Sequence, residues 1–151
     1  MMTWIETEAG LQPPVTEGVV WKHRTPGPAL RRDVVNISGY RESVALHFRQ
    51  VLPASLTISL VICFGEPFSI ARGQASSFES VGWSFAAGMS TAPVTIDSFG
   101  AASCVTITFT PPGAHRFFRV PMHELASRMV AFDDILGNKA GEEVRLFCRL
   151  R

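Results

Sequence analysis

Seven short segments between residues 34 and 109 alternate apolar and polar side chains with the period of two that β-strands show. The segments cover residues 34–38, 43–49, 56–64, 67–71, 81–86, 94–99 and 104–109. Turn-forming residues separate them, at Ser38-Gly39, Gly65-Glu66-Pro67, Arg72-Gly73 and Phe99-Gly100. Gly tolerates a positive φ and Pro pre-sets φ, so both favour chain reversal. Many short strands with short connections predict a small barrel or a sandwich.

After residues 110–113 (Thr-Pro-Pro-Gly) the period becomes helical. The pair Phe117-Phe118 precedes a break at Pro121, and Leu125 and Met129 follow four residues apart, on one helix face. The pattern predicts two short helices.

Two further helical signals follow. Asp133 stands directly before Asp134, Ile135 and Leu136, where an N-cap is expected. Residues 141–151 have the pattern of a further amphipathic helix. The fold class is therefore expected to be mainly β with two or three short C-terminal helices, an α+β arrangement.

The 151 residues are expected to form one domain. Residues 1–33, rich in Pro, Gly and Thr, are expected to be an irregular arm with one strand around Val19-Val20-Trp21, whose Trp tethers the arm to the body. Residues 34–113 are expected to form the barrel or sandwich, and residues 114–151 a helical closing segment.

The composition excludes several classes of protein. A formal charge of +1 gives no general attraction to nucleic acid or anionic lipid. The N-terminus lacks the basic and apolar regions of a secretory signal. The longest apolar stretch, 56–64, is far below the ~20 residues that span a bilayer. We expect a cytoplasmic protein without membrane contact.

Cysteine usage agrees with a reducing compartment. Cys63, Cys104 and Cys148 are odd in number and widely spaced, unlike a zinc site or a disulfide scaffold. Cys63 lies in the most apolar strand, so we expect a core thiol with a raised pKa.

The chain lacks the motifs of common enzymes, among them Gly-x-Ser-x-Gly, a Walker loop and Gly-x-Gly-x-x-Gly. His115 and His123 are eight residues apart, about two helical turns, which is too far for one metal ion. We therefore expect no enzyme, no metal and no cofactor.

Polar stripes along the strands supply the candidate ligand-binding residues. Thr57, Ser59 and Cys63 share one face of their strand, and Cys104, Thr106 and Thr108 share a face of another. In a barrel such stripes line a pocket, whereas in a sandwich we expect them to face solvent. The candidates for ligand contact are His47, Arg49, Ser59, Trp83, Phe85 and Asp97.

Three blocks of sequence carry a resemblance to a known family. They are residues 52–56 (Leu-Pro-Ala-Ser-Leu), 64–68 (Phe-Gly-Glu-Pro-Phe) and 109–121 (Phe-Thr-Pro-Pro-Gly-Ala-His-Arg-Phe-Phe-Arg-Val-Pro), the last followed by Glu124-Leu125. In order and spacing they resemble the N-terminal domain of certain AraC-type transcription regulators. The segments 28–40 and 130–137 are similar to the opening and the close of that domain. Residues 54–56 depart from it, because relatives usually carry Asp-Gly-Cys there.

The resemblance implies a cupin-like domain that binds a small effector or forms a homodimer. In relatives it is joined to a C-terminal pair of helix-turn-helix motifs that reads DNA. Residues 114–151 have neither the length nor the charge for such a pair, so DNA contact is expected only through a domain outside this chain.

Two other functions remain open from the sequence. One is a free-standing cupin-like enzyme with a metal held by His47, His115 or His123. The other is a protein-interaction module that presents the Phe117-Phe118 pair to a partner.

Overall fold

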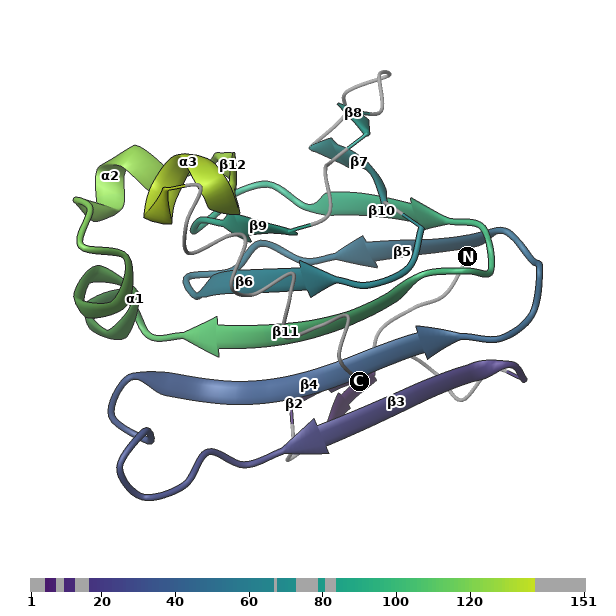
Figure 1. The fold of residues 1–151 in the computed structure, drawn as a ribbon, viewed down its shortest axis with the longest axis horizontal. Coiled ribbons are helices and arrows are strands. Elements are labelled where there is room, and N and C mark those ends of the chain that lie inside the picture. The colour runs from purple at the N-terminus through teal and green to yellow at the C-terminus, as the bar shows by residue number, and fades with distance from the viewer. Residues whose placement is uncertain are drawn as a thin grey trace.

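The computed structural model describes residues 5–7, 10–12, 17–66, 68–72, 79–80 and 84–137. Within them, two antiparallel sheets face each other and short helices follow, so of the two expected architectures the chain adopts the sandwich (Figure 1). No helix of the described residues combines the length and the apolar character that crossing a bilayer demands.

The larger sheet has six strands in the order β12-β9-β6-β11-β4-β3. Their bounds are β3 (Val19–Arg24), β4 (Val34–Glu42), β6 (Ile58–Cys63), β9 (Ser84–Ala87), β11 (Ser103–Phe109) and β12 (Met129–Ala131). The smaller sheet has the order β5-β10-β7-β8, from β5 (Phe48–Leu52), β7 (Ser69–Arg72), β8 (Glu79–Ser80) and β10 (Val94–Ser98). A separate hairpin pairs β1 (Ile5–Thr7) with β2 (Gly10–Gln12).

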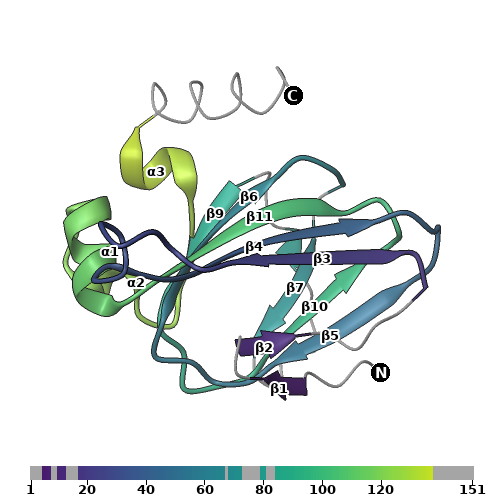
Figure 2. The same ribbon diagram turned by 90° about the horizontal axis from the view of Figure 1, so that it is seen from below.

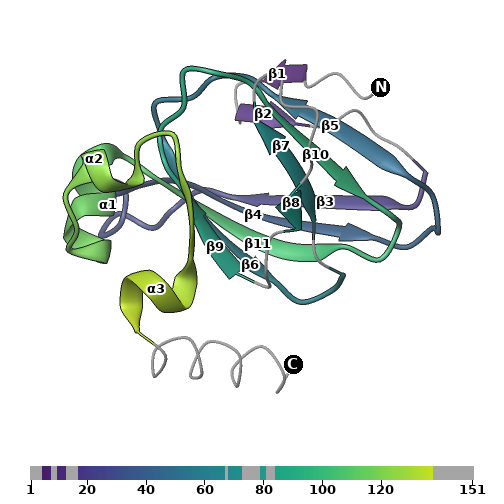
Figure 3. The same cartoon turned by 90° about the horizontal axis from the view of Figure 1, so that it is seen from above.

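The chain passes repeatedly from one sheet to the other between β4 and β11. The β4–β5, β6–β7 and β10–β11 connections meet at one end of the sandwich, which we call the closed end. The β5–β6 and β9–β10 connections lie at the other, the open end. Figures 2 and 3 show the two sheets approaching each other at the closed end and diverging toward α1 and α2.

Two glycines allow the connections at the closed end to pack together. A Cβ on Gly65 would lie 2.1 Å from the carbonyl oxygen of Ala101. A Cβ on Gly100, which has a φ of +88°, would lie 2.0 Å from the carbonyl oxygen of Val44. Any larger residue would separate these connections.

The block at residues 109–121 that carries the family resemblance builds helix α1 (Pro111–Phe118). The Thr110 hydroxyl caps the helix by accepting a hydrogen bond from the amide of Gly113, and Pro111 and Pro112 suit the first turn. Gly113 is needed because a Cβ there would lie 2.2 Å from the carbonyl oxygen of Asp33. The motif therefore fixes the helix against the start of β4.

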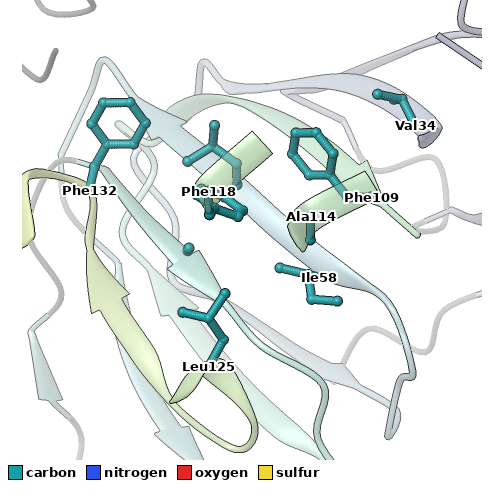
Figure 4. Close-up of a cluster of buried hydrophobic side chains, with 9 residues drawn as sticks. Val34, Ile58, Phe109, Ala114, Phe118, Leu125 and Phe132 are labelled. Carbon is teal, nitrogen blue, oxygen red and sulfur yellow. The ribbon is translucent and has the colours of Figure 1, made fainter. Parts of the chain in front are cut away.

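Helices α2 (Met122–Leu125) and α3 (Phe132–Leu136) follow, and the predicted break at Pro121 is the N-cap of α2. The prediction that Met129 shares a helix face with Leu125 is wrong, because α2 ends at Leu125 and Met129 begins β12. The helices pack on the outer face of the larger sheet, away from the smaller one. Figure 4 shows this helix-side core, which consists of Val34, Ile58, Leu60, Ala86, Phe109, Ala114, Phe118, Leu125 and Phe132.

Further local predictions are wrong. The described part of residues 1–33 holds three strands, β1, β2 and β3, in place of the one expected. Ser38-Gly39 is not a turn, because both residues pair inside the sheet and β4 continues to Glu42. The strand expected at 43–49 begins only at Phe48, since residues 43–47 carry the chain between the sheets. Asp133 does not cap α3: the helix begins at Phe132 with Ala131 at the N-cap, which leaves Asp133 in the first turn.

The segments before and after the sandwich both add strands to it. Residues 19–24 form the edge strand β3, and Trp21 lies 5.6 Å from Tyr40 between ring centroids, which holds that strand to the body. In the closing segment, β12 pairs with β9. The helix expected at residues 141–151 lies outside the described residues.

Replacing Phe118 with alanine tests the helix-side core. Phe118 is 2% exposed, so the change removes a buried ring and leaves a cavity. We expect the free energy of unfolding to fall by about 3–5 kcal/mol in urea denaturation. Phe117→Ala is the matched control, because its ring is 45% exposed, and a loss of about 1 kcal/mol is expected from its aromatic contacts. Equal losses would contradict this assignment of the core.

Candidate ligand-binding cavity

A cavity of about 980 Å³ lies between the two sheets. Its walls are the inner faces of both sheets, and residues of the open end, such as Pro53, Ser90 and Arg128, complete the lining. Pockets for small molecules commonly occupy ~300–1,000 Å³, so the space suits one small ligand.

Strand register arranges the larger sheet's side of the cavity in three tiers. The deep tier, nearest the closed end, holds Trp21, Tyr40 and Cys104, which are neighbours across β3, β4 and β11. The middle tier is the next row of paired residues: His23, Ser38, Thr106, Val61 and Phe85. The rim tier is the row nearest the open end: Asn36, Thr108, Ser59, Ala87 and Met129. Every second residue of each strand therefore faces the cavity.

The facing wall, from the smaller sheet and its connection, is mostly apolar. It consists of Gln50, Leu52, Phe68, Ile70, Val94 and Ile96. At the deep end the rings of Tyr40 and Phe68 lie 6.4 Å apart between centroids, and Trp21 stands edge-on to Tyr40. The deep end is thus aromatic, whereas hydroxyl groups gather toward the rim tier.

Glu42 closes the deep end with a buried carboxylate that is 5% exposed. One carboxylate oxygen accepts hydrogen bonds from the hydroxyls of Tyr40 (2.6 Å) and Ser98. The other accepts from the amides of Gly100 (2.8 Å) and Ala102 (3.1 Å). We call this arrangement the Glu42 clasp. It joins β4 of the larger sheet to β10 of the smaller one and to the connection after β10.

The Glu42 clasp also orders the polar groups at the deep end of the cavity. The side-chain amide of Gln50 donates to the Tyr40 hydroxyl at 3.1 Å. Burial, aided by the hydrogen bond to Glu42, raises the pKa of the Tyr40 phenol above its ordinary value. Tyr40 and Gln50 line the cavity whereas Glu42 does not, so a ligand there meets a neutral phenol and an amide.

Ser59 and Phe85 are the two predicted ligand contacts that line the cavity. Of the other residues of these two predicted polar stripes, Thr57, Cys104, Thr106 and Thr108 line the cavity as well, whereas Cys63 does not. We expected such stripes to face solvent in a sandwich, and that is wrong here because the diverging sheets leave space between their inner faces. Trp83 lies outside the described residues.

His47, Arg49 and Asp97 come together elsewhere, since none of them lines the cavity. Arg49 donates two hydrogen bonds to the Asp97 carboxylate, at 2.7 and 2.6 Å, and the His47 ring nitrogen lies 3.3 Å from it. The Arg49 guanidinium holds the pKa of Asp97 below its ordinary value. Asp97 does not face water, since it is 5% exposed beneath its partners.

The residues of the metal-enzyme alternative do not converge. His115 lies in α1, where its ring Nδ1 is 2.9 Å from the carbonyl oxygen of Val120, and His123 lies in α2. His47 stacks on Phe99, with ring centroids 5.1 Å apart, in the connections at the closed end. In the described ranges no three His, Cys, Asp or Glu side chains are grouped so as to hold a metal ion.

Cys63 and Cys104 lie opposite each other on neighbouring strands, although they are far apart in sequence. Both are buried free thiols, and burial raises the pKa of each to about 12. The expectation of a core thiol at Cys63 is confirmed, and Cys148 lies outside the described residues.

Several residues of the site were not predicted. Glu42 and Tyr40 were missed because Ser38-Gly39 resembles a turn, which ended the predicted strand too early. The alternation of Ser38, Tyr40 and Glu42 beyond it was the available signal. Arg128 follows a turn and belongs to no periodic sequence pattern, so its place at the cavity is evident only from the fold.

Comparison with known proteins gives one match. The family model described as "Domain of unknown function (DUF6597)" matches residues 22–131, which span the strands β4 to β12 and the second half of β3. No curated protein and no solved structure matches the sequence.

Replacing Glu42 with glutamine tests the Glu42 clasp. In the variant, one carboxylate oxygen is replaced by an NH2 group, which points at groups that are themselves hydrogen-bond donors. The negative charge that strengthens the remaining hydrogen bonds is also lost. We expect the free energy of unfolding to fall by about 2 kcal/mol in urea denaturation. Glu66→Gln, an exposed glutamate in the β6–β7 connection, should change it by less than ~0.5 kcal/mol. Equal stability of the two variants would show that the clasp contributes little.

Proposed function

We propose a function for this chain, which belongs to the family described as a domain of unknown function (DUF6597), on the basis of the cavity between its two sheets. The domain binds a small effector molecule between its sheets and serves as the sensing domain of an AraC-type transcription regulator. It binds this molecule without transforming it. The inter-sheet cavity of about 980 Å³ is the observation that carries the proposal.

The lining supports binding of a small molecule. Apolar and aromatic side chains supply area that a ligand can cover, and the hydroxyls of Ser38, Thr106 and Thr108 supply directional contacts. The buried side-chain oxygen of Asn36, in the rim tier, has no hydrogen-bond partner among the described residues. A ligand donor that satisfies it removes the cost of an unpaired buried acceptor.

The resemblance to AraC-type sensing domains, which residues 52–56, 64–68 and 109–121 carry, supports the regulatory part of the proposal. In this scheme the domain forms a homodimer, and DNA is contacted by a second domain outside this chain. Ligand occupancy favours one of two dimer geometries, so the effector controls the spacing of the DNA-reading domains.

Filling the cavity should abolish binding of a neutral apolar probe. We expect N-phenyl-1-naphthylamine to increase in fluorescence when it enters the wild-type cavity. Thr106→Phe places a ring in the middle tier and should lower the probe's affinity by about tenfold or more.

Thr95→Phe is the matched control for this experiment. Thr95 lies on β10 between Val94 and Ile96, which line the cavity, so its own side chain lies on the opposite face of that sheet. This variant should bind the probe as the wild type does. Failure of the wild-type domain to bind any neutral apolar probe would overturn the proposal.

The mass of the native protein in its source cells tests the regulatory part. An antibody against this domain should detect a band larger than 16.5 kDa by roughly one hundred residues, the size of one further domain. A band at 16.5 kDa would leave ligand binding standing and remove the role as half of a transcription regulator.

A further inference from the structure

We infer that the cavity selects an amphipathic anion, a molecule with an elongated apolar body and one negatively charged head group. The body lies between the sheets and the head group lies at the open end, beside Arg128. This inference rests on the proposed function, since it names the class of ligand that the same cavity takes.

The first observation is the charge of the lining. Among the described residues that line the cavity, none is Asp or Glu. Glu42, the acidic residue nearest to the deep tier, has both oxygens occupied by hydroxyl and amide donors in the Glu42 clasp. A ligand anion therefore meets no carboxylate along the wall, and a ligand cation finds none to pair with.

The second observation is the place of Arg128. Its backbone amide donates to the carbonyl oxygen of Leu125 at 3.1 Å, and its own carbonyl oxygen accepts from the amide of Gly88 at 3.0 Å. The preceding residue, Ser127, donates from its amide to the carbonyl oxygen of Met89 at 2.7 Å. These bonds fix the backbone at the edge of the cavity, where Arg128 is an exposed residue.

The third observation is the change in polarity along the cavity. Ser55, Thr57, Ser59, Ser90 and Thr108 line the end that holds Arg128. Rings gather at the opposite end, where Trp21 and Phe68 flank the phenol of Tyr40, which burial keeps neutral. A charged head group is solvated among the hydroxyls at the open end, and an apolar body is covered by the rings and by the smaller sheet.

The length of the cavity suits a chain of intermediate length. Asn36 in the rim tier and Tyr40 in the deep tier are four residues apart on β4, a distance of about 13 Å along a strand. Decanoate, decanol and decylamine share one ten-carbon body of comparable length and differ only in the charge of the head group. They are the probes for the experiment.

The experiment measures how well each probe displaces N-phenyl-1-naphthylamine at neutral pH and low ionic strength. Decanoate should displace it about tenfold better than decylamine, because one head group is attracted to Arg128 and the other is repelled. Added salt should reduce this difference. The ratio of decanoate affinity to decanol affinity isolates the effect of charge from the effect of the shared body.

Arg128→Gln removes the cation and keeps a polar, though shorter, side chain. This variant should lower the decanoate-to-decanol ratio about fivefold, the scale of an exposed ion pair. Its decanol affinity should stay at the wild-type value. Arg41→Gln is the control, because Arg41 is an exposed arginine on β4 that is not part of the lining, and it should leave the ratio unchanged.

Each outcome decides the inference. A ratio that falls in Arg128→Gln and not in Arg41→Gln supports it. Equal ratios in the wild type and Arg128→Gln, or displacement led by decylamine, overturn the anionic head group while the proposed function stands. If none of the three compounds displaces the neutral probe, which itself still binds, the inference that the ligand is an amphiphile is overturned. Failure of the neutral probe itself to bind overturns the proposed function as well.

Discussion

One buried carboxylate holds the two sheets together at the point where they come closest. The Glu42 clasp gathers two hydroxyls and two backbone amides from both sheets and from the connection after β10. Removing a carboxylate from water costs several kcal/mol unless its hydrogen bonds are replaced, and here all four donors replace them. Because the sheets are fixed at the closed end, they can diverge at the other end and leave a cavity. The same bonds keep the negative charge out of the cavity lining.

The sequence predicts which polar residues share a strand face, but not whether that face points into the sandwich or toward solvent. Alternation places Ser59 with Thr57, and Thr106 with Thr108, on shared strand faces, and the structure has them so. Alternation cannot say whether such a face looks inward or outward, because that depends on which sheet covers it. His47, Arg49 and Asp97 show the same limit. Alternation along the segment predicted as a strand, residues 43–49, places His47 and Arg49 on one face. The pairing of β5 with β10 nevertheless decides that both meet Asp97 away from the cavity.

Other parts of the fold depend on contacts that are distant in sequence. The block at 110–113 is recognisable as a helix start, but the need for Gly113 comes from the carbonyl of Asp33, some eighty residues earlier. Glycine alone misleads at Gly39, where the strand continues and a Cβ would meet no atom within 4 Å. Arg128 carries no local pattern, since its position at the cavity is set by backbone bonds to Gly88 and Leu125.

The short strand β12 touches two cores at once. Met129 lines the cavity and packs against the buried cluster that contains Tyr40 and Phe85, whereas its neighbour Val130 packs against the helix-side core. Successive residues of a strand point to opposite faces, so β12 gives one side chain to the cavity wall and the next to the helix-side core. Helix α3 begins directly after this strand, at Phe132. The strand β12 is thus shared between the wall of the cavity and the core beneath the last described helix.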